Sequence, residues 1–477
     1  MALKTDREKT AHLLRRFGLG ASESEVDYYV QGGWKSAVDK LLNYDQVAEP
    51  ADITIDKFAL PNPQGVPQLR IQGVVAWWHV RILTTRRPLL EKMTVFWHDH
   101  FATSASKVNV PPLMYQQNET IRSNATGKFQ TLLLEMSKDP AMIFWLDNQY
   151  NVRGKANENF AREVMELFTL GIGNYSEKDI QEASRAFTGW TFRRTRRFDN
   201  PQVGRAADFL FRPGQHDADE KTVFGKTGPF GGEDIIAMLC EMPQTAKYIV
   251  TKLWEWFAYA EPAPALIEKL TTQFRESGLD IKVILRAIME SPEFYSDKAE
   301  RAIYKNPVDF IIPTLRQLGL GEIVASQNFD PEQGPVARLG RVAPAAAAAQ
   351  SANAMGMQLL FPPDVAGWDS GPAWITTATI VERIGWADRI FGTSPPAQRR
   401  AQISFPAYGL FAADPTPEGV VSKLVSVFDA PIQKAKIPQL VTAAKKACEG
   451  QLTRQNANQT AAAVCRLIFG SPEFQFA

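Results

Sequence analysis

Apolar residues recur along most of the chain at the three- and four-residue spacing of helices with one buried face. The pattern is clearest in the segment 88–101, PLLEKMTVFWHDHF, which opens on a proline suited to a first helical position. Its apolar stripe consists of Leu89, Met93, Phe96 and Trp97. Similar runs follow one another between Gly- and Pro-containing breaks. The pattern predicts a mainly α fold, a large orthogonal bundle of many helices.

Helical periodicity stops between residues 191 and 232, where we expect a small irregular or β-hairpin insertion. The segments FLF (209–211) and KTVFG (221–225) have the composition of short strands. They are predicted to pair with each other around the loop GQHDADE. Helices resume at Glu233.

We expect one mostly helical domain over residues 1–477, with a subdivision into 1–320 and 321–477 as the alternative. The sequence R-x-I-x-x-S-P-E-F occurs twice, within 279–294 and 458–474. Two explanations remain open for this repeat: an internal duplication, or two helix junctions of the same kind with Ser as cap and Pro at the first position.

Composition excludes several classes of protein. With Lys+Arg 53 against Asp+Glu 52, the net charge is +1, so no overall field attracts nucleic acid or an anionic membrane. Three cysteines are too few for a disulfide scaffold or a structural zinc site. The N-terminal stretch lacks the apolar core of a signal peptide, and no apolar run reaches the length of a membrane span. We expect a soluble cytoplasmic protein and leave its oligomeric state open.

The segment 157–190 concentrates polar residues on a strongly helical run. At helical spacing, Asn159, Glu163 and Glu166 lie within about 60° of one another, beside an apolar stripe. Two carboxylates so placed could act as an acid–base pair if their pKa values differ. The alternative is a set of carboxylates that pair with arginines such as Arg185.

Histidine and carboxylate ligands also suggest a divalent metal site for Zn, Mn or Fe. The chain has five histidines, and three of them fall in polar motifs. The candidate ligands are His98, His100, His216, Glu163, Glu166 and Asp217. If the helix over 88–101 persists, His98 and His100 point to different sides; if it breaks after Trp97, they share a face. For His100 the competing explanation is a core imidazole hydrogen-bonded to a carbonyl group.

Other kinds of site have weaker support. No G-x-S-x-G elbow is present, and GLGAS (18–22) lacks the Lys-Ser/Thr of a phosphate-binding loop. The arginines within 193–197 have no interleaved aromatic platform, so a flexible basic loop is expected there and no nucleic-acid partner.

Several long motifs occur in the order typical of one family. They are RRFGLGA (15–21), KMTVFWHDHFATS (92–104), DPAMIFWLDN (139–148), NENFAREVMELFTLGIGNYSEKDI (157–180), AFTGW (186–190), HD with KTVFG (216–225), FPPDVAGWDSGPAW (361–374) and SPEF (471–474). On these motifs the chain resembles, over nearly its whole length, the bacterial family called domain of unknown function 1800. The resemblance implies no activity or catalytic residue. Many relatives are exported with leaders, and the sequence here shows none.

The residues therefore carry the functional hypothesis. We expect a metal-dependent hydrolase or oxidase, with Asn159, Glu163 and Glu166 as catalytic residues and His98, His100, His216 and Glu163 as metal ligands. Its substrate, a small molecule or a polymer, is not indicated by the sequence. The alternative is a metal-free helical scaffold, or a partner-binding protein, whose polar motifs are structural ion-pair networks.

Overall fold

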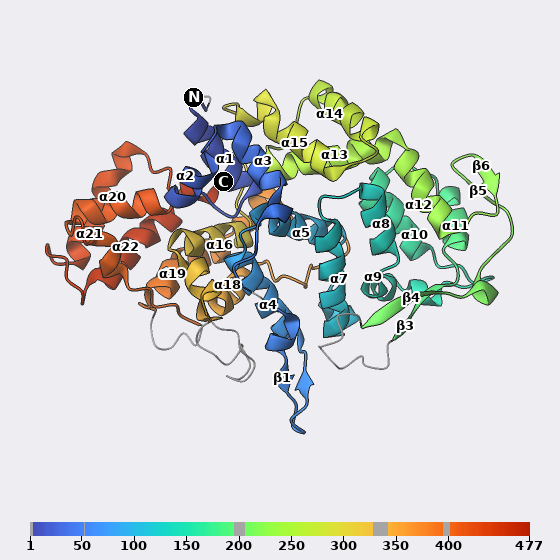
Figure 1. Ribbon diagram of the computed structural model, residues 1–477, viewed down its shortest axis with the longest axis horizontal. Helices are drawn as coiled ribbons and strands as arrows, with labels where there is room; N and C mark the ends of the chain where they lie inside the picture. Colours follow the sequence, from blue (N-terminus) through green and yellow to red (C-terminus); the bar gives the residue numbers. More distant parts are fainter. Residues whose placement is uncertain (1–2, 52, 195–205, 328–341, 395–400) are drawn as a thin grey trace.

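Helices form most of the chain, as the spacing of apolar residues predicts (Figure 1). The computed structural model describes residues 3–51, 53–194, 206–327, 342–394 and 401–477. Within these ranges the strands form only two-stranded antiparallel sheets. None of the described helices is both long enough and apolar enough to cross a bilayer.

The first two of the three N-terminal helices begin at side-chain caps, and the third begins after Gly33 without one. They are α1 (Asp6–Phe17), α2 (Glu23–Tyr29) and α3 (Trp34–Leu42). As its spacing predicts, Ser22 caps α2 by accepting the backbone N–H of Glu25.

The long segment between α3 and α4 (Ile71–Thr84) holds short 3₁₀ turns and the hairpin of β1 (Leu60–Pro61) and β2 (Pro67–Gln68). This hairpin projects from the body below α4 (Figure 1).

Two hydrophobic cores lie on either side of the helix α5 (Pro88–His100). The first core packs α1, α3 and α5 against α8 (Phe129–Ser137), α10 (Glu158–Met165), α11 (Glu177–Ala186), α12 (Gly232–Glu241), α13 (Pro243–Phe257), α14 (Pro264–Glu276) and α15 (Ile281–Glu290). In Figure 1, α8 and α10–α12 lie on the right of α5 and α13–α15 lie above it.

The second core packs α4 against helices that come mostly from the C-terminal third of the chain. These are α16 (Pro307–Gln317), α17 (Leu320–Ala325), α18 (Ala343–Ala354), α19 (Thr377–Phe391), α20 (Pro417–Val427), α21 (Ile437–Ala447) and α22 (Ala457–Phe469). The helix α7 (Pro111–Asn124) contributes to both cores, and the short α6 (Ala105–Val108) and α9 (Pro140–Trp145) pack beside it. The division at residue 320 stays a prediction; this core takes residues from both sides of that position.

The helix α5 is buried on nearly its whole circumference because it serves both cores. Met93 and Trp97 belong to the first core, and Val95 belongs to the second. Polar side chains on this helix are therefore also buried, including Glu91 and Lys92. Such groups need partners inside the protein, so this helix is a candidate location for a functional site.

The predicted strand pairing between 191 and 232 is wrong. The strand β4 (Ala207–Phe211) pairs with β3 (Trp190–Arg194), whereas β5 (Lys221–Val223) pairs with β6 (Lys226–Gly228). Phe224 and Gly225 both have positive φ, 50° and 74°, which is the conformation of a two-residue hairpin turn. In KTVFG, the residues 221–223 are thus strand β5, and Phe224 and Gly225 form the turn that leads into β6. The arginines at 195–197 lie outside the described residues.

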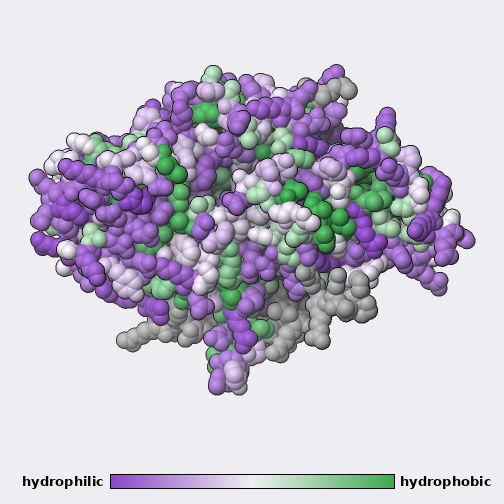
Figure 2. All heavy atoms as spheres, turned by 180° about the vertical axis from the view of Figure 1, so that it is seen from behind, coloured by the Kyte–Doolittle hydropathy of each residue, from purple (hydrophilic) through white to green (hydrophobic). Residues whose placement is uncertain are grey.

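On the face seen from behind, hydrophilic side chains dominate, and hydrophobic ones gather in several separate patches (Figure 2). Such scattered patches are ordinary for a globular protein. This face by itself therefore points to no single docking area.

Candidate functional site

The helix α5 runs unbroken through FWHDHF, and this decides where its histidines point. The Nε2 atom of His98 accepts the backbone N–H of Leu360 at 3.1 Å, and its ring lies against Trp368. The Nε2 atom of His100 lies 3.1 Å from the carbonyl oxygen of Phe168. Of the two sequence alternatives the persistent helix is correct, so His98 faces one core and His100 the other.

Both imidazoles are neutral at physiological pH. Burial lowers the pKa of His98 to about 3. Burial also lowers the pKa of His100 well below its usual value, and the nearby Lys252 cation acts in the same direction. The accepting nitrogen of His98 is already occupied, and Nδ1 of His100 is buried without a hydrogen-bond partner in the structure. The two rings are thus core side chains, each within hydrogen-bond distance of a backbone group, the Leu360 N–H for His98 and the Phe168 carbonyl for His100.

The structure does not gather the predicted metal ligands. Among the described residues, no group of three or more His, Cys, Asp or Glu side chains is arranged to hold an ion. His98 and His100 point to different segments, and Nδ1 of His216 lies 2.9 Å from the carbonyl oxygen of Thr188. The metal hypothesis therefore gains no support from the geometry.

The pair His216–Asp217 fastens a loop to α11. The Nε atom of Arg185 donates to Asp217 at 2.8 Å, and this bond holds the pKa of the carboxyl below its usual value. Lys221 donates through Nζ to the Asp217 carbonyl oxygen at 2.6 Å. The carboxylate of Asp217 and the Nδ1 atom of His216 thus both have structural partners, as in the ion-pair alternative.

The acidic flank of α10 is partly assembled as predicted. Burial raises the pKa of Glu163, and repulsion by Glu166 adds to the effect. Glu166 accepts a hydrogen bond from the hydroxyl of Tyr175. Asn159 donates through Nδ2 to the Leu146 carbonyl oxygen at 3.2 Å. The carboxylate of Glu166 thus acts on that of Glu163, and the catalytic role of both stays a prediction.

Just after Glu163 the helix widens into the π-helical turn η4 (Glu166–Leu170). The hydroxyl of Thr169 donates to the Val164 carbonyl oxygen five residues earlier, at 2.7 Å. This turn leaves the carbonyl group of Phe168 available to His100. Turns of this kind are frequent at functional sites. The two densest polar motifs of the sequence, 96–101 and 157–190, therefore meet at this one hydrogen bond.

Replacing Glu163 by glutamine is expected to keep or raise stability at pH 7. The folded-state pKa of Glu163 lies above the unfolded value, so its contribution to stability is present at low pH and lost as pH rises through that raised pKa. Glutamine removes the disfavoured charge. Urea unfolding at pH 7 and pH 4 measures the difference in the free energy of unfolding between Glu163→Gln and the wild type. This difference should vanish at pH 4. As a control, Glu177→Gln removes an ion pair with Arg162 and should lower stability slightly. A clear loss for Glu163→Gln at pH 7 would instead reveal a buried ion pair.

A cavity of about 260 Å³ opens at the C-terminal end of α5, beside Asp99. Its walls come from α5, from α13, from the segment 302–309 and from the loop 368–374, which are distant in sequence. The aromatic lining residues are Trp256, Tyr304, Trp368 and Trp374. Among the described residues that line it, the charged ones are all acidic: Asp99, Glu255, Asp309 and Asp369. Two motifs of the sequence, 92–104 and 361–374, thus form one site.

Asp99 is the residue of this cavity with the most unusual environment. Burial raises its pKa to about 6, although the backbone N–H of Trp368 donates to Oδ1 at 2.8 Å and Lys252 lies nearby. Gly367 makes this approach possible: with φ +93°, a Cβ atom there would lie 2.4 Å from Oδ1. Near pH 6 both the protonated and the ionised form of this carboxyl are therefore populated, as general acid–base catalysis requires.

Asp99 is absent from the site predicted from the sequence. It stands between the two predicted histidines, and the loop 361–374 carries the tryptophans and glycines that enclose it. These were the available signals. The sequence does not show that the loop folds onto the end of α5, because 262 residues separate His98 from its partner Leu360.

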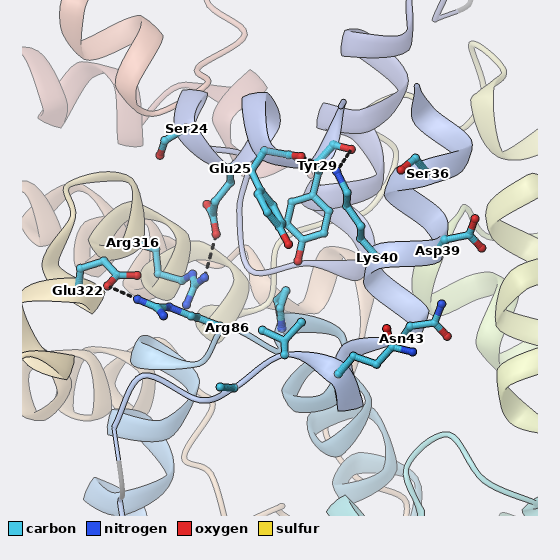
Figure 3. Close-up of a pocket in the computed structure, with 15 residues that line it drawn as sticks. Ser24, Glu25, Tyr29, Ser36, Asp39, Lys40, Asn43, Arg86, Arg316 and Glu322 are labelled. Carbon is cyan, nitrogen blue, oxygen red and sulfur yellow. Dashed lines mark hydrogen bonds and ion pairs between the residues drawn. The ribbon is translucent and has the colours of Figure 1, made fainter. Parts of the chain in front are cut away.

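A larger cavity, of about 750 Å³, lies between α2, α3 and the start of α5 (Figure 3). Its charged groups are largely satisfied by one another. Arg316 pairs with Glu25 at 2.8 Å, and Arg86 pairs with Glu322 at 3.2 Å. Lys40 donates to the Tyr28 carbonyl oxygen at the end of α2 at 2.7 Å. This cavity holds no group with the properties of Asp99.

Residues 12–476 match the family described as "Protein of unknown function (DUF1800)". The chain belongs to this family. The resemblance carried by the motifs is thereby confirmed over nearly the whole length of the chain. No curated protein and no solved structure matches it. The description of the DUF1800 family states no activity, so a function has to be argued from the cavity itself.

Proposed function

We propose that this protein is a hydrolase whose active site is the cavity beside Asp99, with Asp99 as general acid. The observation that carries the proposal is a carboxyl with a pKa of about 6 in a cavity walled by aromatic rings. A carboxylic acid in an apolar pocket with a second carboxylate nearby is the arrangement that cleaves glycosidic bonds. The substrate class proposed is therefore an uncharged glycoside.

The step uses side chains of this chain and water. Asp99 gives its proton to the oxygen of the leaving group as the C–O bond breaks. A water molecule attacks the carbon, and a second carboxylate, Glu255 or Asp369, takes the proton of that water. One C–O bond, the O–H bond of Asp99 and one O–H bond of water break; one C–O bond and the O–H bonds of the leaving group and of the second carboxylate form, and proton exchange with solvent then restores both carboxyl groups. The indole and phenol rings supply flat apolar surfaces with polar edges for the sugar.

Three consecutive residues fix the position of the acid. His98 receives the Leu360 N–H, Asp99 receives the Trp368 N–H, and His100 lies against the Phe168 carbonyl oxygen. The end of α5 is thereby bound to three separate segments. Such support from neighbouring hydrogen bonds holds a catalytic group in one orientation. The two histidines are positioning residues in this proposal.

Hydrolysis of a set of methyl and 4-nitrophenyl glycosides of common pyranoses tests the proposal. The general acid must be protonated, so kcat/KM should fall as pH rises above about 6. The titration of Asp99, followed by carboxyl ¹³C NMR, should have its midpoint near the upper limb. No turnover of any member of the set, together with a midpoint below about 5, would contradict the proposal.

A further inference from the structure

Two adjoining cavities near α1 bring several cationic side chains together, and the inner one shares Asp309 with the cavity of the proposed active site. Arg15, Ala21, Arg301 and Asp429 line both cavities. The outer cavity measures about 540 Å³, and the inner one measures about 30 Å³ and is also lined by Lys305. Arg15 and Ala21 belong to the motif RRFGLGA, which the proposed function does not use.

Close packing at Gly20 brings these elements together. Gly20 has φ +117°, and a Cβ atom at this position would lie 2.9 Å from the Cβ of Pro313 in α16. A larger residue would push α16 away from the end of α1. Gly20 and Pro313 both line the inner cavity. The glycine of the motif thus sets the width of this cavity.

Around the inner cavity three cationic side chains, Arg15, Arg301 and Lys305, face two carboxylates, and the outer cavity is also lined by Glu8, Glu23 and Glu300. The two carboxylates that line the inner cavity are already engaged: Asp429 binds Arg15 at 2.8 Å and Arg301 at 3.1 Å, and Asp309 pairs with Lys92. Lys305 has no ion-pair partner among the described residues; its Nζ lies 3.7 Å from the ring centre of Phe474.

Further cationic groups lie behind this layer. Arg383 donates to the Lys305 carbonyl oxygen at 2.8 Å, and Arg16 is buried with two of its guanidinium nitrogens, Nε and NH1, unpartnered. Arg15, whose side chain is 10% exposed, keeps an unpartnered Nε. Guanidinium nitrogens that are buried without a hydrogen-bond partner are costly, although Arg15 also binds Asp429 and Arg16 donates to the Ala299 carbonyl oxygen.

The electrostatics agree with this geometry. Burial and the positive charge of Arg301 lower the pKa of Lys305 well below its usual value; Asp429 opposes this shift, and Arg383 and Arg15 add to it. The pKa of Arg16 falls to about 9, also chiefly through burial. An added anion would raise the pKa values of both groups toward their ordinary values.

We propose that the inner cavity binds the oxygen atoms of a phosphate group, held by Lys305, Arg15 and Arg301. About 30 Å³ admits one or two atoms of the size of a water molecule, since one water needs roughly 10–15 Å³. The remainder of the ligand extends into the outer cavity. Arg and Lys are the side chains that bind phosphate best. The site is independent of the hydrolase proposal.

Calorimetric titration of the whole chain with inorganic phosphate tests this site. Phosphate should bind saturably at pH 7, and Lys305→Met should weaken binding at least about tenfold, as expected for loss of a charge-assisted contact. The Lys305 variant should fold, because it removes a buried cation without an ion-pair partner. Lys298→Met is the matched control: its Nζ binds the Glu261 carbonyl oxygen outside both cavities, and phosphate affinity should not change.

Titrations in two buffers of different ionisation enthalpy add a second readout. Phosphate binding should take up protons as Lys305 gains its charge, and the uptake should shrink in Lys305→Met. Equal affinity in wild type and Lys305→Met would overturn the proposal, as would the absence of saturable binding. Sodium chloride at the same ionic strength should not compete; full competition by chloride would show a general anion site and overturn the assignment to phosphate.

Discussion

Replacing Glu91 by alanine should lower the free energy of unfolding by about 3–5 kcal/mol, the usual effect of removing one partner of a buried ion pair. Glu91 is 0% exposed, and it accepts hydrogen bonds from three side chains of two other helices. The indole of Trp78 and the Nε of Arg81 donate from α4, at 3.0 and 2.8 Å. Arg122 of α7 donates from Nε at 2.7 Å and from NH2 at 3.0 Å. Its removal leaves the buried cation of Arg122 without its main partner.

The same carboxylate should make the protein sensitive to acid. Arg122 and Arg81 overcome the cost of burial and lower the pKa of Glu91 to about 2. Because the folded value lies below the unfolded one, the stabilisation is complete above roughly pH 4.5 and is lost as pH falls toward 2. Urea unfolding between pH 7 and pH 3, followed by circular dichroism, measures both effects. The wild type should lose stability over this range, and Glu91→Ala should lose much less.

An exposed ion pair provides the control for Glu91. Glu290 binds Arg286 one helical turn away at 3.1 Å, and both side chains are 39% exposed. Glu290→Ala should cost at most about 0.5 kcal/mol, as solvent screens such pairs. Equal losses for Glu91→Ala and Glu290→Ala would mean that the buried network contributes no more than a surface pair.

The sequence predicts the helices well because their signals are local. Pro88 opens α5 at the expected residue, and Ser176 with Asp179 forms the predicted capping box at the start of α11. The apolar stripe of 157–170 is buried as expected, including Phe160 and Val164. The predicted pairing of 209–211 with 221–225 is wrong because both segments are short and their composition does not reveal the turn at Phe224.

The site was predicted only in part, because its contacts are long-range. The sequence pointed to the motif that holds His98, Asp99 and His100, yet it favoured the histidines as ligands. Burial between two cores makes both rings neutral, and neither core is visible in the local pattern. Asp99 becomes unusual only when the loop 361–374 covers it. Glu91 was missed for the same reason: its partners Arg81 and Arg122 come from separate helices.

Replacing Asp99 by asparagine should reduce kcat/KM for methyl glycosides about 10²–10⁴-fold, the usual contribution of a general acid. Asparagine keeps an oxygen for the Trp368 N–H, so the loop should stay in place. The decrease should be much smaller for 4-nitrophenyl glycosides, since their leaving group departs without protonation. The upper pH limb near 6 should disappear in the variant, because that limb reports the titration of Asp99.

Asp364→Asn is the matched control for Asp99→Asn. Asp364 lies in the same loop that covers the cavity, is exposed, and accepts only the backbone N–H of Ala366, at 2.8 Å. This variant should keep the rate and the pH profile of the wild type. If Asp99→Asn hydrolyses both substrate types at equally reduced rates and keeps the limb near pH 6, Asp99 is not the proton donor. Its raised pKa would then report burial alone, and the cavity would serve for binding.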